Sequence, residues 1–153
     1  MRLKSVQLLE SKKIPYRLIE LSQKGISFDD VVKYSKDRIN PEEICKTIIV
    51  KDKKGNYYAF LLKGKDKINF SKAREIIGEK ISIVSYDDLL KKTGTEPGAV
   101  CPFLLDFPLF VDKKVFESKK INFGSGDHLY GLEITSADLS KIISFTIWEV
   151  AEK

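Results

Sequence analysis

The order of apolar and polar positions along the chain predicts short helices that alternate with short strands. In the first 13 residues, valine and leucine recur at close to helical spacing, and Pro15 ends the segment. Two later helices are expected to begin at Ser-x-x-Asp patterns, at Ser27 and Ser85, because a serine hydroxyl can accept a free backbone N–H of the first turn. The predicted helices span residues 1–13, 27–36, 41–43, 71–77 (capped by Ser71) and 86–92, with a last one from Ser136.

Segments rich in β-branched and aromatic residues predict the strands. Residues 44–51 and 57–62 are mostly apolar and flank a Lys-Lys-Gly-Asn turn, so they are expected to form a buried hairpin. No repeat or linker interrupts the pattern, which indicates one compact mixed α/β domain over residues 1–153, with helices around a central mixed, largely antiparallel sheet. The other expected strands are 16–21, 81–84, 109–111, 121–123, 132–134 and 145–150.

Composition narrows the class of protein. The chain has 153 residues, of which 42% are apolar and 32% charged, which is typical of a soluble globular protein with a real core. One histidine and two distant cysteines do not provide the closely spaced ligand pairs of a standard zinc site, or a disulfide framework. We therefore expect no metal and no other cofactor. The apolar stretches are too short to span a bilayer, so a cytoplasmic protein without a membrane partner is expected.

The net charge says less about the class of protein than the composition does. The formal net charge is +5, carried by lysines that are spread along the chain. Such a balance fits a modest attraction to nucleic acid, but most of these lysines are expected to form an ordinary solvated surface.

Lys46 is the first candidate for chemistry, because it interrupts an otherwise apolar strand. It either points outward on a half-exposed strand, or lies at the edge of a pocket where it binds an anion or orients a carbonyl. The residue pattern alone favours the outward position.

Two Gly-rich segments are further candidates. Residues 94–103 contain two prolines and two glycines, so they form either a structural connector or a rigid loop whose backbone groups surround a ligand. Residues 124–126 read Gly-Ser-Gly, either a hairpin turn or a close approach of backbone to ligand, and His128 follows. Cys101 is not expected to be a nucleophile, since the single histidine is distant in sequence, and Cys45 is expected to face the core.

Taken in order, three segments resemble a known family. They are Lys-Thr-Ile-Ile-Val at 46–50, Gly-x-x-Pro-Gly-x-x-x-Pro-Phe at 94–103, and Gly-Ser-Gly at 124–126 with a following Leu-Glu-Ile strand. The set resembles the YbaK/ProX type of aminoacyl-tRNA deacylases, which includes the editing insertion domain of bacterial prolyl-tRNA synthetases. The likeness extends from about residue 15 to 150. This sequence departs from the common family pattern in two places. Leu104-Leu105-Asp106 replaces the glycine that often follows the Pro-Phe pair, and the segment between Gly126 and Glu133 is slightly longer than in many members.

The resemblance implies a trans-editing hydrolase that cleaves the ester between a wrong amino acid and the 3′ end of tRNA, in particular tRNA for proline. Lys46 would bind the terminal adenosine and its phosphate, and backbone groups of the Gly/Pro loop would help to activate a water or a group of the substrate. His128 falls where alanine-specific members often carry a pocket histidine, so alanine is favoured and cysteine is the other candidate. The residues implied as catalytic are Lys46, Gly94 and Gly98, and those implied as substrate-binding are Thr95, Pro97, Cys101, Pro102, Phe103, Gly124, Ser125, Gly126 and His128.

Two other functions stay open at this point. The same fold could serve as a tRNA- or nucleotide-binding module without catalysis, or as a regulatory interaction domain with an incidental pocket. The expected partner is the 3′ end of an aminoacyl-tRNA. The resemblance leaves open whether the chain docks on prolyl-tRNA synthetase and whether it is a monomer or a homodimer.

Overall fold

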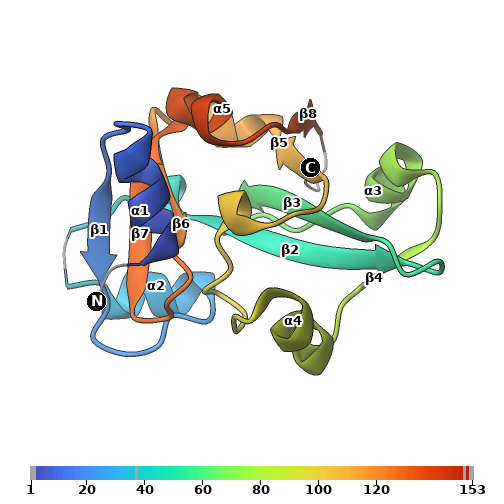
Figure 1. The fold of residues 1–153 in the computed structure, drawn as a ribbon, viewed down its shortest axis with the longest axis horizontal. Helices are drawn as coiled ribbons and strands as arrows, with labels where there is room; N and C mark the ends of the chain where they lie inside the picture. Colours follow the sequence, from blue (N-terminus) through green and yellow to red (C-terminus); the bar gives the residue numbers. More distant parts are fainter. Residues whose placement is uncertain (1–2, 37, 150, 152–153) are drawn as a thin grey trace.

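Two β-sheets lie beside each other in the computed structural model, which describes residues 3–36, 38–149 and 151 (Figure 1). The smaller sheet is antiparallel with strand order β1-β7-β6, and the larger is mixed with order β4-β2-β3-β5-β8. The predicted mixed α/β class is confirmed, while the strands expected in one central sheet are divided between two. The strands are β1 (Arg17–Glu20), β2 (Cys45–Asp52), β3 (Tyr57–Lys63), β4 (Ile81–Ile83), β5 (Leu109–Asp112), β6 (Lys120–Gly124), β7 (Tyr130–Thr135) and β8 (Thr146–Trp148).

The helices are short and lie around these sheets. Ser27 and Ser85 accept the backbone N–H groups of Asp30 and Asp88, as their sequence patterns predict. The prediction that Ser71 caps a helix is wrong, because the Asn69 side chain accepts from the Lys72 N–H and the helix begins earlier. The α-helices are α1 (Lys4–Ser11), α2 (Phe28–Tyr34), α3 (Phe70–Ile77), α4 (Tyr86–Thr93) and α5 (Leu139–Ile142), and the 3-10 turns are η1 (Pro41–Glu43), η2 (Pro102–Leu104), η3 (Lys113–Glu117) and η4 (Ser136–Asp138). The predicted helix and strand ends at residues 1–2 and 150 lie outside the described residues.

Strand β2 connects the two sheets. It pairs with β3 along nearly its whole length, and an isolated bridge between Ile44 and Asn122 joins its start to β6. On its other side, β4 pairs only with the end of β2, from Val50 to Asp52. The first half of β2 therefore has an edge that no strand covers among the described residues.

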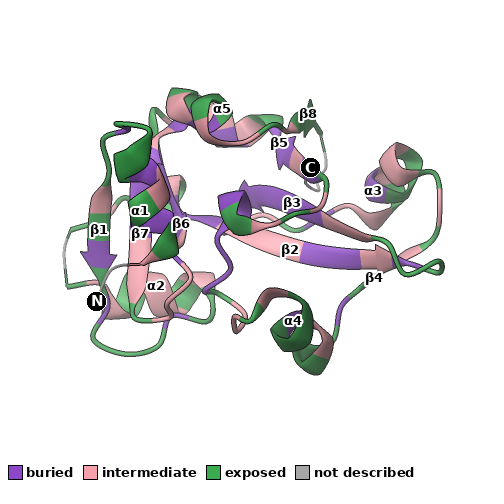
Figure 2. Ribbon diagram, in the orientation of Figure 1, coloured by how far each residue is buried: buried purple, intermediate pink, exposed green. Residues whose placement is uncertain are grey.

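Apolar side chains pack in two clusters, one for each face of the larger sheet. The main cluster includes Val6 and Leu9 of α1 together with Leu132 and Ile134 of the smaller sheet, and α1 lies next to that sheet (Figure 1). The second cluster packs α3 on β3, around the fully buried Phe60. The buried residues follow the central strands, whereas α4 and β8 are mostly exposed (Figure 2). Burying these side chains supplies most of the driving force for folding.

The carboxylate of Asp52 organises the turn of the β2–β3 hairpin. It accepts the backbone N–H groups of Lys54 at 2.9 Å and Asn56 at 3.0 Å, the Asn56 amide at 3.1 Å and the Tyr58 hydroxyl at 3.0 Å. Burial opposes the charged form, but the hydrogen bonds from Asn56, Tyr58 and Lys54 outweigh it and lower the pKa of Asp52 to about 2.

We expect the Asp52 carboxylate to make the free energy of unfolding depend on pH in the acid range. Because its pKa falls from 3.8 in the unfolded chain to about 2 in the folded one, its stabilisation is complete above pH 3.8 and is lost as the pH falls through 2. Chemical denaturation at pH values from 5 to about 2 measures the change in the free energy of unfolding. Asp52→Asn should be less stable at pH 5 and should show a flatter decline. An equally steep decline in this variant would contradict the assignment.

Candidate active site

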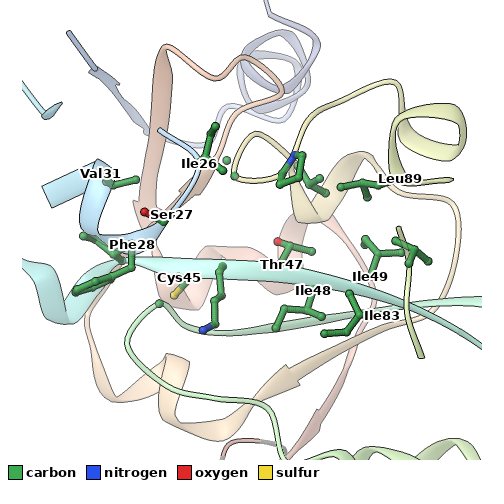
Figure 3. Close-up of a pocket in the computed structure, with 18 of the residues that line it drawn as sticks. Ile26, Ser27, Phe28, Val31, Cys45, Thr47, Ile48, Ile49, Ile83 and Leu89 are labelled. Carbon is green, nitrogen blue, oxygen red and sulfur yellow. The ribbon is translucent and has the colours of Figure 1, made fainter. Parts of the chain in front are cut away.

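A cavity of about 310 Å³ lies along the uncovered edge of β2 (Figure 3). Because residues of both faces of a strand reach its edge, the walls include Thr47 and Ile49, which project to one side of β2, and Ile48, which projects to the other (Figure 3). The remaining walls come from four segments that are distant in sequence: residues 26–31 with the start of α2, residues 83–89 with the start of α4, residues 97–100 of the Gly/Pro loop, and Gly124 at the end of β6.

Backbone groups of β2 face this cavity. The N–H of Val84 donates to the carbonyl of Ile49 at 3.1 Å, on the side of β2 away from β3. Since backbone groups alternate along a strand, Thr47 presents its N–H and carbonyl on the same side, two residues earlier, where β4 does not reach. The Thr47 hydroxyl lines the cavity as well, and its oxygen is buried without a hydrogen-bond partner. A ligand at this edge can pair with the Thr47 backbone groups.

Lys46 is half-buried and forms part of the cavity wall. Burial lowers the pKa of its ammonium group, and the negative charge of Asp66 opposes this change. No ion pair with Lys46 is found among the described residues, whereas Asp66 lies 3.8 Å from the ammonium of Lys114. The sequence left two alternatives for Lys46, an outward position on a half-exposed strand or a place at the edge of a pocket. In the structure Lys46 is half-buried and also lines the cavity, so both descriptions apply. It provides a cation for an anionic or carbonyl group of a ligand.

The Gly/Pro loop reaches the cavity because two glycines allow close backbone approach. A Cβ atom on Gly98 would lie 2.4 Å from the carbonyl oxygen of Gly25, and one on Gly124 would lie 2.5 Å from the carbonyl oxygen of Val100. The N–H of Gly126 also donates to the carbonyl of Ala99 at 2.7 Å. The loop is thus held between residues 25–26 and the Gly-Ser-Gly turn.

Glu96 links the segments around the cavity mouth. Its carboxylate lies 3.5 Å from the Lys24 ammonium and 3.8 Å from Nδ1 of His128. It also contacts the Tyr86 hydroxyl, and burial together with the Glu96 charge raises the pKa of Tyr86. One loop carboxylate therefore faces three other segments, which positions His128 and Tyr86 relative to the Gly/Pro loop.

Of the residues singled out from the sequence, Lys46, Pro97, Gly98 and Gly124 line the main cavity. The others take different positions. Gly94 ends α4 with a positive φ of 74°, and its N–H donates to the carbonyl of Leu90. Thr95 lies in a hydrogen-bonded pair with Thr93, and Ser125 and Gly126 shape their turn through backbone contacts. Cys101, Pro102 and Phe103, the last residues of the loop, are buried.

Neither cysteine is placed as a nucleophile. Burial raises the pKa of the Cys45 thiol to about 12, and burial also raises the pKa of Cys101 far above its ordinary value. Both side chains belong to the main apolar cluster, as the sequence predicts for Cys45.

A second, much smaller cavity of about 30 Å³ adjoins the first. The two share the walls formed by Val31, Ile44, Cys45, Gly98 and Gly124. His128 lines the small cavity rather than the large one, together with Asn122 and Tyr130.

Three residues of this region were not identified from the sequence as site residues. They are Thr47, Glu96 and Asn122, which contact the two cavities or hold their walls. The available signal was a polar residue within an apolar strand, at Thr47 and again between Ile121 and Phe123. Simple alternation explains such a residue equally well as one that faces solvent, so the signal did not single them out.

Comparisons with known proteins identify the family. Residues 27–142 match the family model described as aminoacyl-tRNA editing domain. YwhH of Bacillus subtilis (strain 168), an uncharacterised protein, is 25% identical over 112 residues, which are 72% of this chain and 71% of YwhH.

Solved structures show the same fold. The hypothetical protein APE2540 superposes with a TM-score of 0.87 at 23% identity, over 97% of this chain and 100% of that one. A protein proposed to be a trans-editing enzyme for prolyl-tRNA synthetase superposes with a TM-score of 0.83 at 18% identity, over the whole of both chains.

No three His, Cys, Asp or Glu side chains among the described residues gather where they could hold a metal ion. None of the helices in residues 3–36 and 38–149 is long and apolar enough to cross a bilayer.

The two glycines of the Gly/Pro loop, both with positive φ, should respond differently to a methyl group. Gly98→Ala places a Cβ atom against the backbone of residues 25–26, so we expect it to destabilise the protein by about 3 kcal/mol or more. Gly94→Ala has φ of 74° but open space around the new atom, so about 1 kcal/mol of backbone strain is expected. Thermal or chemical denaturation compares them directly. Equal losses would mean that the close contact at Gly98 is absent.

Proposed function

This chain belongs to the aminoacyl-tRNA editing domain family, and we propose that it is a deacylase that hydrolyses the ester of a mischarged tRNA. The observation that carries the proposal is a cavity lined by Lys46, which has no ion pair among the described residues, and by Thr47, whose hydroxyl oxygen has no hydrogen-bond partner among them. The 3′ end of an aminoacyl-tRNA offers matching groups, namely a terminal nucleotide, an ester carbonyl and a small amino acid.

Ester hydrolysis needs few catalytic groups, because the ester is already activated. A water adds to the carbonyl carbon, negative charge develops on the carbonyl oxygen, and the 3′ oxygen of the tRNA leaves with a proton. Fixed N–H and hydroxyl donors that stabilise this charge, with a substrate held in place, provide much of the rate. The Thr47 backbone N–H and hydroxyl, and the Lys46 ammonium, are the donors that we assign to substrate and transition state.

The thiols contribute nothing to this mechanism. A nucleophilic cysteine attacks as the thiolate, and burial keeps the pKa of Cys45 at about 12. The attacking group in the proposed reaction is therefore a water, or a hydroxyl or amine of the substrate itself.

For the finer substrate, we propose tRNA for proline that carries a small amino acid such as alanine or cysteine. The likeness to a protein proposed as a trans-editing enzyme for prolyl-tRNA synthetase supports the tRNA, and His128 beside the small cavity supports a small side chain. We place the activity in the cytoplasm and allow for a synthetase as partner.

A panel of purified mischarged tRNAs tests the enzyme proposal. We expect at least one aminoacyl ester to be released faster than in buffer, and Lys46→Ala to lower that rate by about 100-fold, because a charge-assisted contact to the substrate is lost. Lys46→Arg tests whether charge alone suffices. Lys12→Ala, at an exposed position at the end of α1, is the matched control and should leave the rate unchanged.

The outcomes separate the alternatives. Binding of charged tRNA to the cavity without release of the amino acid would identify a non-catalytic binding module. Turnover that does not respond to Lys46→Ala would contradict the role given to this lysine.

A further inference from the structure

The segment that follows strand β3, residues 64–67, begins at the cavity wall. Gly64 lines the cavity, and its N–H donates to the carbonyl of Ile44 at 2.7 Å, just before the start of β2. Ile68, which follows the segment, is 5% exposed and belongs to the apolar cluster on β3. Both ends of the segment are therefore anchored, which fixes its position beside the first half of β2.

Lys67 of this segment is exposed and has no role in the reaction described above. No ion pair with Lys67 is found in residues 3–36 and 38–149. The side chain lies close enough to Lys46 for the two charges to interact. Burial is the main reason that the pKa of Lys46 is lowered, and the positive charge of Lys67 lowers it further. An anion placed beside both ammonium groups would relieve this repulsion.

Lysines outnumber carboxylates around the segment. Glu42 lies 2.6 Å from Lys65 and also faces a second lysine at 3.8 Å. Asp66 lies 3.8 Å from Lys114, and its side chain is only 15% exposed. The charge of Glu117 also acts on Lys65. With the two lysines that have no ion pair, five lysines face three carboxylates, so an approaching anion meets an excess of positive charge.

We propose that Lys67, beside Lys46, binds a backbone phosphate of the single-stranded 3′ end of tRNA at the edge of the cavity. This inference rests on the proposed deacylase function. It goes beyond that function because it assigns a contact to the strand outside the reacting ester, on a residue that neither the sequence motifs nor the reaction singled out.

Lysines elsewhere around the cavity are engaged by carboxylates. Lys24 lies 3.5 Å from Glu96, and Lys51 donates to Asp88 at 2.6 Å. A phosphate at either position would have to compete with the carboxylate already there. The pair formed by Lys46 and Lys67 offers its charge without that competition, which favours this edge for the strand.

Replacing Lys67 tests the contact. We expect Lys67→Ala to raise the KM for a mischarged tRNA by about 10-fold and to leave kcat nearly unchanged, because a phosphate contact is made equally in the ground state and the transition state. Lys67→Arg keeps the charge and should stay within about 2-fold of the wild type. The matched control is Lys53→Ala, an exposed lysine at the far end of β2, about 20 Å along the strand from Lys46, and it should change nothing.

The dependence on salt separates a phosphate contact from a structural role. In a plot of log kcat/KM against log salt concentration, the slope for Lys67→Ala should be shallower than for the wild type by about 0.7, the value for one phosphate of a single strand. A variant that only disturbs the fold would lose activity with the slope unchanged. An unchanged slope, an unchanged KM, or a loss confined to kcat would overturn the proposal.

Binding of uncharged tRNA, measured with the same variants, tests Lys67 independently of hydrolysis. We expect Lys67→Ala to weaken this binding by about 10-fold and Lys67→Arg to retain it. Equal binding by the wild type and Lys67→Ala would overturn the proposal. Failure of the wild type to hydrolyse any mischarged tRNA would contradict the proposed function, and the binding measurement would then decide the role of Lys67 by itself.

Discussion

The site depends on one strand whose edge is only partly covered. Strand β2 lies inside the larger sheet along β3, yet β4 pairs with its last residues alone. Beyond the bridge at Ile44, its first half therefore has no strand partner on that side among the described residues, and a protein normally covers or blocks such an edge. Here the Gly/Pro loop, α2 and α4 enclose that edge without pairing with it, and the enclosed space is the cavity (Figure 3).

Glycine is what allows the enclosing segments to approach. Gly98 rests against the backbone of residues 25–26, and Gly124 against Ala99 and Val100. Chain segments packed at backbone distance hold one another in place, so Gly98 and Gly124 present main chain to a cavity that is otherwise lined mostly by apolar side chains. Such walls are rigid and carry fixed dipoles, which suits a reaction that needs orientation more than a strong acid or base.

The sequence allowed the fold class, most elements and part of the site to be predicted. Capping at Ser27 and Ser85 and the buried hairpin follow from local patterns, and the structure confirms them. Lys46, Pro97, Gly98 and Gly124 were identified through motifs and do line the cavity. Gly94 belongs to the same motif but ends α4, because a glycine that stops a helix and one that permits close packing look alike in sequence. The connection between the two sheets depends on the bridge between Ile44 and Asn122, a contact between distant segments that no local pattern encodes. Thr47, Glu96 and Asn122 acquire their positions only through such contacts.

The cavity walls come from segments that are far apart in the sequence, and this affects when the cavity forms during folding. Segments from residue 26 to Gly124 must all be in place before the edge of β2 is enclosed. Contacts of such long sequence separation form late in folding, after most of the chain has been ordered. A partly synthesised or locally unfolded chain thus has no enclosed cavity, so the ability to hold a ligand there appears only together with the native state.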